Sequence, residues 1–325
     1  MAKRRFHNVN ASGIIAASSG SLSGGAEHSL ANILIRHGLF SAEIEESFSL
    51  RFFAESGRVV VRLPCLKASL ALALVIIGTI EARAGSCPTA TDAIATDRPD
   101  VTNSSLVVPV GSLQNENGVN FSMRDDGRSV DGTNSRWRLG IAPCLEILVD
   151  LPTYVAPLQG PANFGFSDVS PALKWQISPI PVKFDLSVVF GAALPTGAVE
   201  IAGRGVQPYL QLPWSWELHE GWGVSGMFTE FFRPNDLTAR SITETTLVLE
   251  KQLSEQFSLF TEYVGDYPQG ASPSQLWNSG AVYHMNRLQQ VDFHIAFGLS
   301  HNAPSYIVGV GYSFRIDGLF RQTTR

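Results

Sequence analysis

Apolar and polar side chains alternate most clearly in residues 291–300, V-D-F-H-I-A-F-G-L-S. Successive side chains of an extended strand point to opposite faces, so one face of this segment is wholly apolar and the other is small, polar or charged. A soluble sandwich strand can show such a face once. Here the pattern recurs from residue 116 to residue 315, with turn residues between the repeats. The recurrence predicts an all-β fold, a transmembrane antiparallel up-and-down β-barrel whose outer face meets lipid.

We expect about twelve strands in this barrel. A tilted strand needs roughly 9 to 11 residues to cross a bilayer, and most of the segments provide that length. The segments 206–218 and 220–231 are rich in Trp, and Pro208 and Pro213 interrupt the first of them, so their registers are less well defined. The expected strands are residues 116–126, 134–141, 145–151, 166–178, 182–193, 206–218, 220–231, 241–251, 256–265, 274–285, 290–300 and 305–315.

The connections between these strands alternate between long and short. If the first strand runs outward, the long connections lie outside the cell and the short ones face the periplasm, as in bacterial outer-membrane barrels. A soluble sandwich has no reason to show this alternation. The expected long connections are residues 126–133, 152–165, 195–205, 233–240, 266–273 and 301–304, and the short ones are residues 142–144, 179–181, 253–255 and 286–288 and the corner at Glu220.

A signal peptide is expected upstream of the barrel. Residues 68–80 form the most apolar run; basic residues precede it, and Ala82-Arg83-Ala84 follows it. This order is typical of a secretory signal, and the run is too short for a transmembrane helix, which needs about 20 apolar residues. A buried helix is the alternative. We assign residues 58–84 to the signal peptide, with cleavage after Ala84.

The remaining segments follow from this assignment. Residues 1–57 have no expected role and represent either an over-extended reading frame or an unusually long leader. Residues 85–115 are polar and rich in turn residues, and we expect a periplasmic lead-in that folds partly into the barrel mouth. Residues 116–315 form the outer-membrane barrel, and residues 316–325 form a C-terminal tail.

The composition limits the classes of partner. Only 16% of the 325 residues are charged, against a typical quarter, and the formal net charge is −5. A nucleic-acid-binding protein usually concentrates basic residues on one face, so no nucleic-acid partner is expected. The sequence shows no metal-ligand spacing of His and Cys, no phosphate-binding Gly-rich loop and no Gly-x-Ser-x-Gly elbow. We therefore expect no cofactor.

Two of the three cysteines share one side of the predicted topology. Cys87 lies in the lead-in and Cys144 lies in a short turn, both on the periplasmic side, whereas Cys65 precedes the signal core and is removed. Thiols in an oxidising compartment are candidates for a disulfide. A Cys87–Cys144 bond would tether the lead-in to the barrel rim. The alternative is that both thiols stay free or that one pairs with another molecule.

Several short motifs resemble one family of outer-membrane proteins. They begin with T-D-R-P-D at residues 96–100 and P-V-G-S-L-Q-N-E-N-G at residues 109–118, followed by L-P-T-G at 194–197, F-T-E-Y at 260–263 and A-P-S-Y at 303–306. The chain resembles, over about residues 95–314, the outer-membrane transporter family named for the MetA pathway of phenol degradation. The resemblance implies a β-barrel grouped with transporters, without a defined substrate. The family tends to end on the aromatic residue of its last strand, here Phe314, but this chain continues through Phe320 to Arg325.

The inward face of the predicted barrel collects charged residues. One interpretation is a polar passage whose charges screen solutes; the other is that the charges pair across the lumen and fill it. Eight-stranded barrels are filled by side chains and sixteen-stranded ones leave an aqueous channel, so twelve strands predict a narrow pore. The candidate pore-lining residues are Arg124, Arg136, Arg138, Glu146, Asp150, Lys174, Lys183, Asp185, Glu250, Glu262, Asp292 and His294.

These features predict a channel or transporter in the bacterial cell outer membrane that passes small solutes, with hydrophobic or aromatic compounds among the candidates. Its expected partners are outer-membrane lipid, the solute and the barrel assembly machinery. One alternative is a lipase-like barrel enzyme, which needs Ser, His and an orienting group together on the lipid-facing wall. His294 is expected on the opposite face and His284 has no Ser in register, so we do not expect an enzyme. A structural barrel without transport is the other alternative.

Overall fold

The computed structural model describes residues 87–160, 163–180, 184–202, 205–233 and 240–320, and three short strands nearer the N-terminus. The chain divides into two compact units. In the smaller unit, β1 (Ile44–Glu45), β2 (Ser49–Ala54) and β3 (Gly57–Val61) form an antiparallel sheet. β3 covers the first residues of the expected signal peptide, and residues 62–84 lie outside the described residues, so the signal peptide stays a prediction. No helix among the described residues is long and apolar enough to cross a bilayer.

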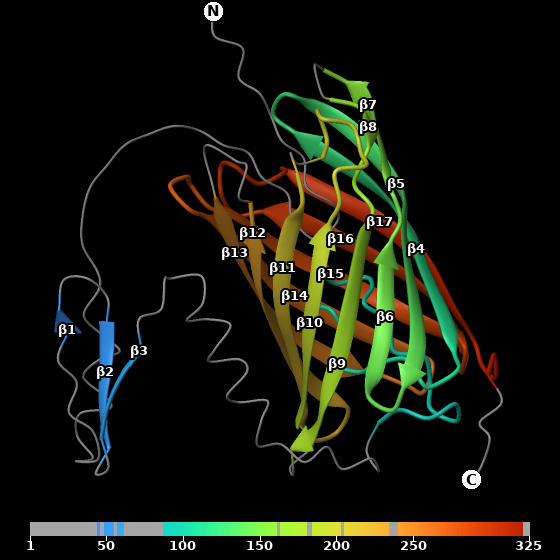
Figure 1. Ribbon diagram of the computed structural model, residues 1–325. Helices are drawn as coiled ribbons and strands as arrows, with labels where there is room; N and C mark the ends of the chain where they lie inside the picture. Colours follow the sequence, from blue (N-terminus) through green and yellow to red (C-terminus); the bar gives the residue numbers. More distant parts are fainter. Residues whose placement is uncertain are drawn as a thin grey trace, which may run out of the picture. The chain divides into compact units, whose positions relative to one another are not determined.

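In the larger unit, the described residues form a closed antiparallel barrel of twelve strands, as predicted (Figure 1). Each strand pairs with its neighbour in the barrel, and the last strand pairs with the first from Tyr306–Met123 to Ile316–Leu113, so that the barrel has no free edge. The barrel strands are β4 (Leu113–Arg124), β5 (Gly127–Ala142), β6 (Leu145–Asp150), β9 (Ser170–Ile180), β10 (Phe184–Ala193), β11 (Gln207–Glu217), β12 (Trp222–Phe232), β13 (Ser241–Gln252), β14 (Phe257–Pro268), β15 (Ser274–Asn286), β16 (Gln289–Gly298) and β17 (Tyr306–Ile316).

Two of the expected long connections are wrong. β5 begins at Gly127, so residues 127–133 belong to a strand and β4 turns into β5 at Asp125–Asp126. The expected loop at residues 152–165 contains β7 (Tyr154–Gln159), which pairs with β5 and, at its start, with β8 (Gly165–Phe166). The start of β5 is polar and lacks the alternation of residues 291–300, so its strand forms because pairing satisfies backbone N–H and C=O groups. β7 carries exposed apolar side chains at Tyr154 and Leu158, but it is only six residues long and contains Pro157.

The predicted faces of β16 are confirmed by the exposure of its side chains. Phe293 and Phe297 are 47% and 49% exposed, whereas Asp292 and His294 between them are 5% and 8% exposed. The cross-strand neighbour of Phe293 in β17 is Val310, which is also exposed. A continuous apolar belt therefore covers the outside of this wall, and polar side chains point into the lumen.

The lead-in, residues 87–112 in the structure, runs inside the barrel before it becomes β4. We name the end of the barrel that carries the Cys144 turn the Cys144 end, and the opposite end the β7 end. Polar side chains of the wall hold the lead-in in the order β16, β14, β11, β9 and β6, at Thr96, Thr102, Asn103, Val107 and Val108. Asp97 and Asn103 also contact Arg136 of β5, so the lead-in runs through the lumen between facing walls. This is a deeper insertion than the partial one expected at the mouth.

At its end, the lead-in backbone lies directly against the backbone of β5 at Gly140. Val110 forms a parallel bridge with Gly140, and Gly111 N–H donates to the Gly140 carbonyl at 2.8 Å. A Cβ atom at position 140 would overlap the carbonyl oxygens of Val108 and Pro109. The absence of a side chain at Gly140 therefore permits this close backbone contact.

Both ends of the larger unit meet at the Cys144 end. Cys87 and Cys144 are joined by a disulfide with their Cα atoms 5.2 Å apart, within the usual range for such a bond. After β17, Leu319 N–H donates to the Gly111 carbonyl at 2.7 Å, and Asp317 accepts a hydrogen bond from Ser112. Residues 317–320 thus pack on the lead-in, while residues 321–325 of the expected tail lie outside the described residues.

The outward position of Phe293 generates a test of the register. Phe293→Arg should reduce the folded fraction, because a cation near the midplane of the lipid face costs on the order of 2–4 kcal/mol. Phe293→Leu, which keeps an apolar side chain there, should fold like the parent protein. The measurement is the heat-modifiable band on a gel after assembly. Equal folded fractions for the two variants would contradict the assigned faces.

The Cys87–Cys144 disulfide can be tested by peptide mapping. Digestion of the exported protein without reduction should release one peptide pair linked through Cys87 and Cys144. In Cys144→Ser, Cys87 should become accessible to alkylation, because its partner is missing. Alkylation of both cysteines in the native parent protein would show that the lead-in is not tethered.

Candidate functional site

The candidate site is the lumen, which the lead-in divides into two cavities. One lies toward the β7 end and has a volume of about 170 Å³. The other lies toward the Cys144 end and has a volume of about 330 Å³. Arg98, Pro99 and Asp100 line both cavities, so this turn of the lead-in stands at their junction.

Arg138 on β5 binds the lead-in at residues 95–97 and again at Leu106. Its side chain is fully buried and forms ion pairs with Asp97 at 3.2 Å, Glu116 at 3.1 Å and Glu146 at 2.9 Å. Its Nη1 and Nη2 atoms also donate to the carbonyl oxygens of Ala95 and Leu106, at 3.0 and 2.8 Å. A buried charge is tolerated only when it is paired and hydrogen-bonded, and the lead-in supplies part of that pairing.

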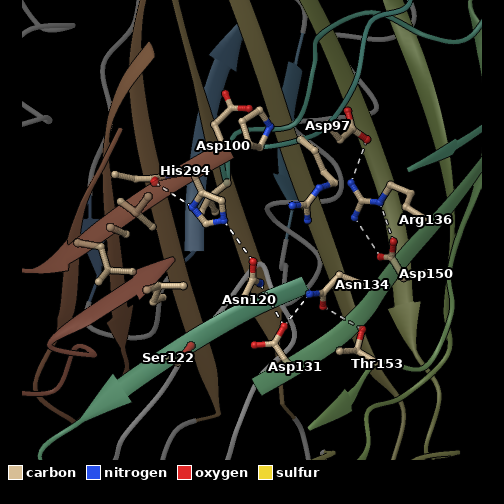
Figure 2. A pocket seen from close by; sticks show the side chains of 18 of the residues that line it. Asp97, Asp100, Asn120, Ser122, Asp131, Asn134, Arg136, Asp150, Thr153 and His294 are labelled. Atoms are coloured by element: carbon tan, nitrogen blue, oxygen red, sulfur yellow. Dashed lines mark hydrogen bonds and ion pairs between the residues drawn. The ribbon is translucent and has the colours of Figure 1, made fainter. Parts of the chain in front are cut away.

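Two further cationic side chains of the same wall contact Asp97. Arg136 donates to Asp97 at 2.9 Å and forms a two-bond contact with Asp150 at 2.6 and 3.0 Å, which Figure 2 shows on either side of its guanidinium group. The ammonium group of Lys174 lies 3.5 Å from Asp97. Burial alone would raise the pKa of Asp97, but the charges of Arg138, Lys174 and Arg136 hold that pKa well below its ordinary value. Asp97 therefore remains ionised at the centre of this network.

The opposite wall holds the lead-in by hydrogen bonds to Glu262. Its carboxylate on β14 accepts from the backbone N–H groups of Val101 and Thr102 at 3.0 and 2.9 Å, and from the Thr102 hydroxyl at 2.8 Å. Asn278 on β15 donates to the same carboxylate at 2.9 Å. Hydrogen bonds to an ionised acceptor are among the stronger ones in proteins, so Glu262 fixes the middle of the lead-in.

The cavity toward the β7 end has a polar side. His294 contacts the Oδ1 atoms of Asn278 and Asn120 at 3.1 and 3.2 Å, and Asn120 donates to Asp131 at 3.1 Å. Asn134 donates to the same carboxylate at 2.6 Å and accepts from Thr153 (Figure 2). These bonds link β15, β16, β4 and β5 into one hydrogen-bonded belt.

The same cavity has an apolar side on neighbouring strands. Val264, Leu276, Ala296 and Ile307 form a buried cluster on β14 to β17, and Val101 of the lead-in packs against it. All five side chains line the cavity. A solute here would contact both an apolar surface and hydrogen-bonding groups.

The structure separates the candidate pore-lining residues into groups. Arg124, Arg136, Asp150 and His294 line the cavity toward the β7 end, and Glu250 lines the one toward the Cys144 end. Asp185 lines a third cavity beside Cys87. Glu262 and Asp292 bind the lead-in, the latter through Arg98 at 3.4 Å. Lys183 lies outside the described residues.

Three further candidates, like Glu262 and Asp292, point inward without lining any of these three cavities. Arg138, Glu146 and Lys174 are fully buried. Ion pairs with Asp97 or hydrogen bonds to the lead-in backbone occupy them. Side-chain direction alone therefore did not identify the surface of the passage.

Sequence reasoning missed the lead-in residues that shape the lumen. Asp97, Arg98 and Asp100 belong to the T-D-R-P-D motif, which carried the family resemblance but was not among the expected pore-lining residues. The density of charge in that motif was the available signal. Among the described residues, no group of three or more His, Cys, Asp or Glu is placed to hold a metal ion.

Solved structures similar to this chain are outer-membrane barrels. The COG4313 outer membrane channel from Pseudomonas putida F1 has a TM-score of 0.51 and 12% identity, over 65% of this chain and 97% of that chain. The KdgM porin in complex with disordered oligogalacturonate (TM-score 0.45, 9% identity, 62% and 98% covered) and the CymD monoaromatic hydrocarbon channel (TM-score 0.40, 10% identity, 66% and 90% covered) are more distant. The first likeness supports the fold, and the other two carry no argument.

No curated protein matches the sequence. A family model matches residues 96–316, which is more than half of the chain and runs from the T-D-R-P-D motif to the end of β17. The chain therefore belongs to the family described as "Putative MetA-pathway of phenol degradation".

Proposed function

We propose that this protein is a channel through which small solutes cross the outer membrane. The observation that carries the proposal is the pair of cavities, about 170 and 330 Å³, that share Arg98, Pro99 and Asp100 in their linings inside a closed barrel. A barrel that served only as a structural element would have no need of such space. The lead-in narrows the lumen, so the passage selects small solutes.

The mixed walls of the cavity toward the β7 end favour a solute with both an apolar and a polar part. The cluster of Val264, Leu276 and Ile307 provides an apolar surface, and Asn120 and His294 provide hydrogen-bonding groups in the same cavity. Ligand sites usually combine a mostly apolar wall with a few polar groups. Small hydrophobic or aromatic compounds that carry a hydroxyl group fit this description, in keeping with the family's description.

The exposed apolar belt supports an outer-membrane location with lipid as a partner. Leu247 and Val310, for example, are 52% and 54% exposed on the outer face of the barrel. Such strands insert only as a closed barrel, since bilayer hydrocarbon offers no hydrogen-bond partners. We accordingly propose the barrel assembly machinery as a partner during biogenesis.

A channel explains the site better than a lipase-like enzyme does. The hydrogen-bond partners of His294 are Asn278 and Asn120, and neither is a nucleophile. His294 also points into the lumen, away from the lipid that a membrane lipase must reach. The arrangement of a nucleophile and a base that acyl transfer requires is therefore not found around His294.

The ion pair between Arg138 and the lead-in can be tested by measuring conductance. The purified, reconstituted protein should show small single-channel conductance. Arg138→Ala should increase it several-fold, because breaking a buried ion pair costs on the order of 3–5 kcal/mol and frees the lead-in from this wall. Arg128→Ala is the matched control, because Arg128 lies on the same strand but is exposed and outside the network.

A second variant distinguishes release of the lead-in from misfolding of the barrel in Arg138→Ala. Asp97→Asn changes the lead-in and leaves the partners of Arg138 on β4 and β6 in place. It should also increase conductance, by less than Arg138→Ala. Absence of conductance in folded parent protein and in both variants would favour a structural barrel.

A further inference from the structure

Among the described residues, those that line both cavities belong to the lead-in, and one of them has a long, flexible side chain. They are Arg98, Pro99, Asp100 and Asn103. Asn103 donates a hydrogen bond to Gln211 at 2.9 Å and accepts one from Arg136 at 2.8 Å, so its position is fixed. The side chains of Pro99 and Asp100 are short. The position of the Arg98 side chain therefore decides how much of the space beside this turn is filled.

Two glycines of the barrel wall form a slot that receives the guanidinium group of Arg98. Gly118 on β4 and Gly311 on β17 are direct cross-strand partners. A Cβ atom at position 118 would overlap Cζ of Arg98, and a Cβ atom at position 311 would overlap its Nε. The group can lie this close to the wall because neither position carries a side chain. We name this place the glycine slot.

Few bonds hold Arg98 in the glycine slot. Its Nη2 donates to Asp292 on β16 at 3.4 Å, which is long for a hydrogen bond. Its buried Nε has no hydrogen-bond partner among the described residues. Arg138, by contrast, donates through all three of its side-chain nitrogen atoms. Arg98 is therefore held mainly by the shape of the slot.

Leaving the glycine slot would move both the volume and the charge of this side chain. Arginine stays protonated in proteins, so its positive charge moves with it. In the slot, the charge lies beside Asp292 and the side chain is mostly buried against the wall. Outside the slot, the guanidinium group would occupy the space that both cavities border. The place of Arg98 therefore affects both the size and the charge of the solutes that fit beside it.

We infer that Arg98 sets the width of the passage between the two cavities and that the glycine slot keeps its side chain against the wall. The inference rests on the proposed channel function and names the residue on which the size limit of that channel depends. The lead-in brings Arg98 into the lumen, and the absence of side chains at positions 118 and 311 leaves the passage beside it open.

The experiment is the single-channel conductance of reconstituted Gly118→Ala. The three atoms nearest to the added methyl group all belong to the guanidinium group of Arg98, the end of a flexible side chain, so the barrel should fold and Arg98 should move away from the wall. We expect conductance several-fold below that of the parent protein. The ratio of K⁺ to Cl⁻ permeability should also fall, because cationic side chains that line a pore favour anions.

A double variant tests whether the effect acts through Arg98. Arg98→Ala alone should increase conductance, because a short side chain leaves more space between the cavities. Adding Gly118→Ala to Arg98→Ala should change neither conductance nor the permeability ratio, since no guanidinium group remains to be displaced. Such non-additivity is the expected sign of two side chains in direct contact.

The matched control is Gly223→Ala on β12. The nearest atom to a Cβ at this position is Cβ of Glu250 at 4.0 Å, which is an ordinary contact. This variant should conduct like the parent protein with the same permeability ratio. Heat modifiability on a gel measures the folded fraction of every variant.

The outcomes separate this inference from the proposed function. Unchanged conductance in folded Gly118→Ala, or a loss of conductance that persists in the double variant, would overturn the inference and leave the channel in place. Absence of conductance in both the folded parent protein and folded Arg98→Ala would overturn the proposed function and this inference with it.

Discussion

The need to satisfy the buried guanidinium group of Arg138 shapes the interior of this barrel. Its donors reach three carboxylates and two backbone carbonyls, and both carbonyls, with one of the carboxylates, come from the lead-in. With only its barrel partners, Arg138 would lose three of the hydrogen bonds that offset the burial of its charge. The lead-in is therefore a structural part of the barrel interior, and its removal would leave the wall incomplete.

The lead-in also determines how much of the lumen remains open. Twelve strands enclose more space than an eight-stranded barrel, whose interior side chains alone can fill. A polar segment that runs inside the barrel takes up part of that space and leaves two cavities whose linings share Arg98, Pro99 and Asp100. The width of the passage thus depends on the path of the lead-in as well as on the number of strands.

The two walls hold the lead-in by different chemistry. Toward β5, ion pairs around Asp97 neutralise one another and the disulfide at Cys87 fixes the start of the segment. Toward β14, backbone N–H groups are bound by Glu262, whose negative charge faces no arginine or lysine within ion-pair distance among the described residues. The lead-in is therefore held by ion pairs on one side of the lumen and by hydrogen bonds on the other.

The sequence by itself determined the barrel, because its evidence is local. The alternation in residues 291–300 assigns Phe293 to lipid and Asp292 to the lumen, since the side-chain period of a strand is two. Segments of that kind also defined the number of strands. The polar strand that begins at Gly127 was missed, because backbone pairing with β4 and β7 produces it without an apolar face.

Only the tertiary structure decided which inward residues line the passage. The Thr102 backbone and Glu262 are 160 positions apart in the chain, and no periodic pattern connects them. The direction of Arg138 was predictable from its strand, but its burial beneath the lead-in depends on bonds between distant segments. A polar segment such as T-D-R-P-D carries no apolar face that would place it against a wall. Its position follows from the buried charges and amides that it satisfies, and these come together only when the barrel closes.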